Sequence, residues 1–134
     1  MSDADPAGAA GRAIVVGHGG FAEGLISAVA QISGMGDRLI GLSNTGMTPA
    51  DIESAIRSHL TDAGAQVIFT DLPSGSATIA ARRVMRDAPG VVLVSGVNLA
   101  TLLDFVFTSC PTPTEAARAA ADRGRASLIV VEPT

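Results

Sequence analysis

The sequence predicts an α/β fold: an open, doubly wound and mainly parallel sheet with helices on both faces. Two observations support this prediction. Short apolar runs alternate along the chain with stretches of helical periodicity, and three of these runs have a continuously apolar centre rather than an alternation of apolar and polar residues. Strands have this pattern when both faces of their sheet are covered, as in parallel sheets with right-handed crossovers. We expect the strand order 2-1-3-4, with a C-terminal edge strand.

The predicted strands are the apolar runs at residues 13–16, 38–42, 66–70, 90–95 and 126–131. The first, third and fourth of these are the continuously apolar ones. Ahead of them, residues 1–11 are small and polar, which predicts a flexible N-terminal tail. Residues 12–134 are then expected to form one domain.

Helical periodicity fills the intervals between the strands. Apolar residues recur at helical spacing in residues 21–32, 52–63 and 99–106, and a further helix is expected over 76–87. Thr48 and Thr112 each stand directly before a proline, and this pairs a capping residue with a residue suited to the first helical turn. Glu115 follows Thr112 at capping-box spacing, so a last helix begins there.

The composition is that of a globular protein that does not bind nucleic acid. Of 134 residues 47% are hydrophobic and 16% charged, and the net charge of -4 comes without a basic cluster. The single cysteine, Cys110, excludes an intrachain disulfide and favours a reducing compartment. The chain shows neither a signal peptide nor an apolar stretch of membrane-spanning length, so we expect a cytoplasmic location.

Residues with useful chemistry follow directly after two of the predicted strands. The loop at residues 17–20, which contains His18, follows the first strand, and Asp71 follows the third. Ligands bind an open parallel sheet beyond the carboxyl ends of its strands, where the strand order reverses. In the order 2-1-3-4 this point lies between strands one and three. We therefore expect His18 and Asp71 to face each other.

A histidine beside a carboxylate suits phosphoryl transfer. A neutral imidazole nitrogen is a nucleophile, and a carboxylate bound to the other ring nitrogen fixes the tautomer. The helix that begins near Gly20, with Phe21 in its first turn, offers N–H groups and a favourable dipole to a phosphoryl group. Gly19 and Gly20 allow close approach of the backbone. Ser74 and Ser76 are candidate hydroxyl donors.

Some of these residues also fit purely structural roles. His18 fits an ordinary loop histidine, and Asp71, Ser76 and Asn98 each stand where a turn or cap residue is expected. A cap can also serve a site, so Asn98, which follows the fourth strand, stays a candidate for lining it. One histidine supplies too few ligands for a metal centre, and we expect neither a metal nor an organic cofactor.

Three blocks of sequence together resemble the enzyme IIA component of the mannose/fructose (mannose-sorbose) family of the sugar phosphotransferase system (PTS). The blocks are residues 14–25 (IVVGHGGFAEGL), residues 69–81 and residues 95–103. They occur in the family's order and cover nearly the whole chain after the tail. The second block departs from the family pattern: residues 72–77 read LPSGSA where the family has Gly-Gly-Ser-Pro, which affects the loop and the surface offered to partners.

The resemblance implies a phosphotransferase in which His18 accepts a phosphoryl group from the phosphocarrier HPr and donates it to a IIB component. It implies that Asp71 orients the His18 ring and that Gly75, Ser76 and the glycine-rich backbone line the phosphate pocket. It also implies a homodimer in which residues 126–131 pair with the partner's sheet. Contact with a membrane would then be indirect, through transporter subunits.

Three alternatives stay open. The same site fits a regulator that binds its target according to its phosphorylation state, and it fits the phosphodonor subunit of a dihydroxyacetone kinase. Residues 17–22 also match the dinucleotide-binding pattern G-x-G-x-x-A. However, the second strand ends at residues 42–44 (LSN), which offer no acidic residue for a ribose.

Overall fold

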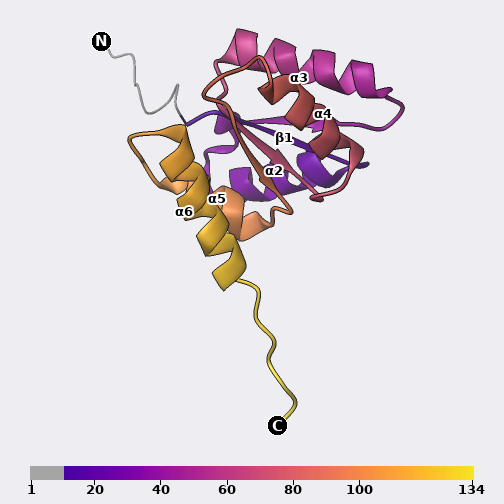
Figure 1. Cartoon of the computed structure of the whole chain (residues 1–134). Helices are drawn as coiled ribbons and strands as arrows, with labels where there is room; N and C mark the ends of the chain where they lie inside the picture. The colour runs from indigo at the N-terminus through magenta and orange to yellow at the C-terminus, as the bar shows by residue number, and fades with distance from the viewer. Residues whose placement is uncertain (1–10) are drawn as a thin grey trace.

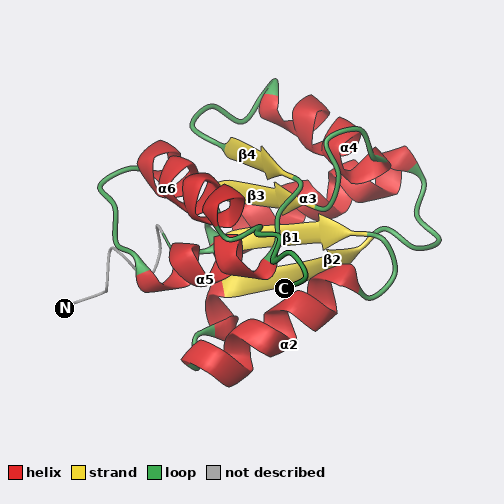
Figure 2. Cartoon of the chain, turned by 90° about the horizontal axis from the view of Figure 1, so that it is seen from below, coloured by secondary structure: helices red, strands yellow, loops and turns green. Residues whose placement is uncertain are grey.

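Four parallel strands form one sheet in the order β2-β1-β3-β4, as predicted (Figures 1 and 2). The structure, a computed structural model, describes residues 11–134, so nearly all of the predicted N-terminal tail lies outside it. The elements are β1 Ala13–Gly17, α2 Phe21–Ser33, the 3-10 turn η1 Gly36–Arg38, β2 Leu39–Ser43, α3 Pro49–Ala63, β3 Val67–Thr70, α4 Ser76–Met85, β4 Val92–Ser95, α5 Leu99–Phe107 and α6 Pro113–Ala126.

The sheet is covered on both faces, which explains why its central strands lack a polar side. Side chains of β1 point alternately to the two faces: Ala13 and Val15 pack with α2, α5 and α6, and Ile14 and Val16 pack with α3 and α4. All four are fully buried. Figure 2 shows α2, α5 and α6 in front of the sheet and α3 behind it.

Helices α3 and α6 begin at the capping residues that the sequence predicts. The Thr48 hydroxyl accepts a hydrogen bond from the Asp51 N–H, and the Asp51 side chain accepts one from the Thr48 N–H, which closes a capping box on α3. Thr112 caps α6 by accepting from the Glu115 N–H. Within residues 11–134, none of these helices has both the length and the apolar character of a membrane span.

The predicted fifth strand does not form within the single chain. Helix α6 continues to Ala126, and the residues after it have no regular structure. Figure 1 shows this C-terminal segment leaving the domain. Leu128, Ile129, Val130 and Val131 are 73% to 89% exposed. A strand needs a neighbouring strand for its backbone hydrogen bonds, and this segment meets none in its own chain. Pairing of residues 126–131 with a partner chain stays a prediction.

Candidate active site

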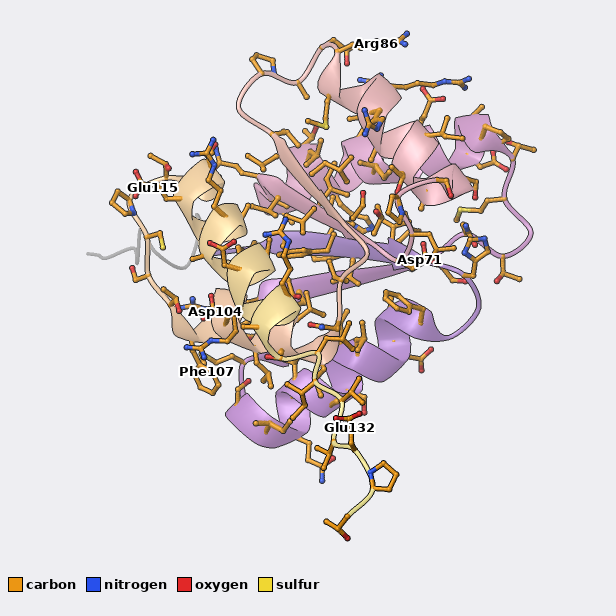
Figure 3. All side chains as sticks on the ribbon, turned by 60° about the horizontal axis from the view of Figure 1, so that its bottom comes forward. Asp71, Arg86, Asp104, Phe107, Glu115 and Glu132 are labelled. Atoms are coloured by element: carbon orange, nitrogen blue, oxygen red, sulfur yellow. The ribbon has the colours of Figure 1, made fainter. Side chains whose placement is uncertain are left out.

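The ends of β1 and β3 bring His18 and Asp71 into contact, as the strand order predicts. His18 Nδ1 lies 2.6 Å from Asp71 Oδ2, and the His18 backbone N–H donates to the same oxygen over 2.9 Å. Figure 3 shows Asp71 at the edge where the strands end, away from Phe107 at the end of α5. The two residues are 53 positions apart in sequence, so their contact depends entirely on the parallel pairing of β1 and β3.

Gly17 and Gly19 make the approach between His18 and Asp71 possible. A Cβ atom on Gly17 would lie 2.7 Å from Phe21 Cδ2 and 3.1 Å from Asp71 Oδ2, so only glycine fits between these two side chains. Gly19 has φ +52°, a left-handed conformation that glycine adopts without strain. Gly17 therefore leaves room at the end of β1, and Gly19 turns the chain directly after His18.

The two side chains differ sharply in exposure. The side chain of His18 is 59% exposed and that of Asp71 only 9%. Burial by itself raises the pKa of the Asp71 carboxyl, but the hydrogen bonds from the His18 ring and backbone N–H, together with the charge of a protonated ring, outweigh it and leave that pKa below its ordinary value. The site therefore combines a carboxylate kept ionised with an imidazole that another protein can reach.

The second ring nitrogen, Nε2, is left for chemistry because Nδ1 is held by Asp71. The ring carbon between the two nitrogens, Cε1, lies against the start of α4: a Cβ atom on Gly75 would be 3.5 Å from it. Gly75 is the N-cap of α4, with no side-chain cap of its own. Helix N-termini present unpaired N–H groups and a positive dipole end, which together favour an anion such as a phosphoryl group.

Two of the three predicted phosphate-binding residues of the first loop already use their backbone N–H groups. The Phe21 N–H donates to the His18 carbonyl over 3.0 Å, and the Gly19 N–H donates to Thr45 Oγ1 over 3.2 Å. Gly20 is the N-cap of α2 and accepts from the Gly24 N–H. The backbone N–H groups of Gly19 and Phe21 are therefore occupied in this structure.

Ser76 is not the helix cap that its position suggests. It is the first residue of α4, after the cap Gly75, and its hydroxyl accepts a hydrogen bond of 2.9 Å from Asn44 Nδ2. Asn44 and Thr45 follow β2 at the same sheet edge, and neither was predicted as a site residue. The signal was available, because the carboxyl end of β2 must lie beside that of β1 in the order 2-1-3-4.

A buried set of hydroxyl groups fixes the turn after Asp71. Thr78 Oγ1 donates to the carbonyl of Leu72, and it lies 2.7 Å from Thr70 Oγ1. Thr70 in turn bonds to Ser95 Oγ over 3.1 Å. Thr70 and Thr78 are almost completely buried. This network ties the loop to β3, α4 and β4 together and so supports the position of Asp71.

The two remaining residues predicted to line the site are Ser74 and Asn98. Ser74 is exposed in the loop between β3 and α4. Asn98 caps α5: its Oδ1 accepts from the Thr101 N–H, and its Nδ2 donates to the carbonyl of Gly124 in α6. Asn98 Oδ1 therefore caps α5, and Nδ2 joins α5 to α6.

An exposed histidine held by a buried carboxylate, next to a helix N-terminus on an open parallel sheet, is an arrangement suited to group transfer. Comparison with known families makes this specific. A family model described as PTS system fructose IIA component matches residues 12–121. The chain therefore belongs to this family, whose members are the IIA components of the mannose/fructose class of the phosphotransferase system.

Solved structures of such proteins share the fold. An EIIA component from Streptococcus agalactiae has a TM-score of 0.82 at 20% identity, covering 89% of this chain and 95% of its own. A mannose/sorbose-specific IIA subunit from Enterococcus faecalis has a TM-score of 0.80 at 19% identity, covering 92% and 96%. A IIA protein associated with the fucose utilization operon of Streptococcus pneumoniae has a TM-score of 0.72 at 23% identity, covering 89% and 91%. Among curated proteins, none matches the chain.

Proposed function

We propose that the protein is a phosphocarrier in which His18 accepts a phosphoryl group from phosphorylated HPr and passes it to a IIB component. The observation that carries this proposal is the 2.6 Å contact between His18 Nδ1 and Asp71 Oδ2. It holds the imidazole with a proton on Nδ1 and a lone pair on Nε2, which is the form of the ring that attacks phosphorus.

In the transfer step, His18 Nε2 attacks the phosphorus atom of the donor. The Nε2–P bond forms while the P–N bond of the donor phosphohistidine breaks, and the electron pair of that bond returns to the donor nitrogen. His18 keeps its proton on Nδ1, so its phosphorylated ring carries a positive charge. The ionised carboxylate of Asp71 lies beside this charge and stabilises it.

The phosphoryl oxygens need hydrogen-bond donors, and the start of α4 supplies them in this proposal. Gly75 lies close to the ring, and the first-turn N–H groups that follow it have no intrahelical acceptor. The Ser76 hydroxyl adds a side-chain donor. Passing the group to a IIB component repeats the same step in reverse, with His18 as the leaving group.

We also propose that the protein is a homodimer in which the C-terminal segments are exchanged. Strand β4 is at one edge of the sheet, and a groove beside it is lined by residues of β4 and α6. The exposed apolar segment at residues 128–131 has the character of a strand that lacks its neighbour. Light scattering should give the mass of a dimer for the full chain and of a monomer after removal of residues 127–134. A monomeric full chain would contradict this proposal.

Phosphorylation in vitro tests the function directly. The protein is incubated with phosphoenolpyruvate, enzyme I and HPr, and intact mass is measured before and after mild acid treatment. One acid-labile phosphate is expected, and it should be lost in His18→Ala and kept in His59→Ala, the matched variant of the other histidine. Labelling of His18→Ala would refute the assignment.

The acceptor separates the proposal from its alternatives. Transfer of label from His18 to a IIB component supports the sugar-transport role. A labelled protein that passes its phosphate to a dihydroxyacetone kinase subunit, or to no acceptor while binding a target protein, would favour the kinase phosphodonor or the regulator.

A further inference from the structure

We propose that Asn44 is a positioning residue for phosphoryl transfer, acting through the hydroxyl of Ser76; this inference rests on the phosphocarrier function proposed above. Asn44 comes directly after β2 and reaches the first residue of α4, where its Nδ2 donates to Ser76 Oγ over 2.9 Å. The bond links the loop after β2 to α4, the helix whose N-cap lies against the His18 ring.

Asn44 is held rigidly enough to orient another group. It is only 8% exposed. Its backbone N–H donates to the carbonyl of Gly17 over 3.0 Å, and its own carbonyl accepts from the Met47 N–H over 3.0 Å. The backbone of Asn44 is therefore tied to the residue that precedes His18. A buried amide group also needs its hydrogen bonds, which gives the side chain a reason to stay on Ser76.

The proposed role of Asn44 depends on which atom donates in its hydrogen bond with Ser76. A serine hydroxyl has one proton to donate and two positions at which it accepts. Because Asn44 Nδ2 donates, it occupies an acceptor position and leaves the hydroxyl proton of Ser76 for another partner. Ser76 adjoins Gly75, which lies against the His18 ring, so this proton is available to a phosphoryl group on Nε2. A donor oriented before the charge arrives needs no reorganisation during transfer.

Two substitutions at position 44 separate orientation from packing. Asn44→Asp keeps the size of the side chain, but a carboxylate only accepts, so it draws the Ser76 proton to itself and away from the phosphoryl group. In Asn44→Leu, the leucine side chain has approximately the shape of asparagine but no hydrogen-bonding group. The hydroxyl of Ser76 is then free to rotate. If Asn44 acts by orienting the Ser76 hydroxyl, His18 should be labelled more slowly in Asn44→Asp than in Asn44→Leu. If Asn44 only fills space, His18 should be labelled faster in Asn44→Asp than in Asn44→Leu.

The test measures single-turnover labelling of His18 by phosphorylated HPr and by potassium phosphoramidate, a small donor with a P–N bond that needs no docking surface. We expect Asn44→Asp and Ser76→Ala each to slow labelling by roughly tenfold or more with both donors. Asn44→Leu should slow labelling less, and it should have no further effect when Ser76→Ala is present. Ser33→Ala, which removes a hydroxyl at the far end of α2, is the matched control and should keep the original rate.

The outcomes distinguish this inference from the proposed function. If the unmodified protein is folded and neither donor labels it, the phosphocarrier function and this inference both fall. If it is labelled and Asn44→Asp is labelled equally fast, only the role of Asn44 is overturned. Equal slowing by Asn44→Leu with and without Ser76 would also overturn it. Should Asn44→Leu fail to fold, the rate of Asn44→Asp relative to the unmodified protein and to Ser76→Ala decides.

Discussion

Asp71 Oδ2 accepts two hydrogen bonds from a single residue, one from the ring of His18 and one from its backbone N–H. Oδ1, the other carboxylate oxygen, is buried and has no hydrogen-bond partner among residues 11–134. One oxygen atom therefore fixes both the path of the loop and the orientation of the ring. We therefore expect the site to be sensitive to changes at Asp71.

Replacing Asp71 by asparagine should slow phosphoryl transfer by roughly 100-fold, because a neutral amide does not stabilise the positive charge on the phosphorylated ring. Single-turnover labelling by phosphorylated HPr measures the rate. Asp87→Asn is the matched control, because Asp87 is a carboxylate paired with Arg57 over 2.7 Å at a distant surface position. Equal rates for Asp71→Asn and the unmodified protein would contradict the role given to Asp71.

The contribution of Asp71 to stability should depend on pH in the acid range. Its folded-state pKa lies below its ordinary value, so the folded state is stabilised above the unfolded-state pKa of about 3.9. That contribution is lost as the pH falls further, through the folded-state pKa. Urea unfolding at a series of acid pH values should show the free energy of unfolding decline less steeply in Asp71→Asn. Parallel curves for the two proteins would show that Asp71 is not stabilised in its ionised form.

Gly17→Ala should damage both the fold and the site. Its Cβ atom would be 2.7 Å from Phe21 Cδ2, so the aromatic ring or Asp71 must move. We expect a loss of about 1–3 kcal/mol in the free energy of unfolding, the range for overpacking, together with slower labelling. Gly24→Ala is the matched control. Its Cβ atom in α2 meets nothing within 4 Å, so this substitution should raise the free energy of unfolding by roughly 0.5–1 kcal/mol. Unchanged stability and labelling in Gly17→Ala would contradict the packing described here.

Gly124→Ala should disturb the packing of α6 against α5. A Cβ atom there would lie 2.0 Å from Thr101 Oγ1 and 3.1 Å from Asn98 Oδ1. We expect a loss of about 1–3 kcal/mol or more, measured by urea unfolding. Adding Thr101→Ala removes the nearest atom, so the double variant should lose less stability than the two single losses added together. Simple additivity would show that the two residues do not interact in this way.

Hydrophobic patterning predicted the four strands of the sheet and the helices α2, α3 and α5, whereas the cap at Thr112 predicted the start of α6. Residues 126–131 have the same apolar character as those strands, yet they form none in the single chain. The difference is physical: an apolar run becomes a strand only where another strand supplies hydrogen-bond partners for its backbone. Ser76 is a second residue whose role depends on tertiary contacts. Its local pattern suits a cap, but Gly75 is the cap, and Ser76 accepts a hydrogen bond from Asn44.

By itself, the sequence determined the order of elements and placed His18 and Asp71 directly after the first and third strands, because periodicity is local. That these two residues meet depends on the parallel pairing of β1 with β3. Only the tertiary structure decided which groups surround that pair. Whether Gly75 lies against the His18 ring, and whether Asn44 reaches Ser76, depends on distances between loops far apart in sequence. Such distances follow from packing the helices on the sheet, and no local pattern of residues encodes them.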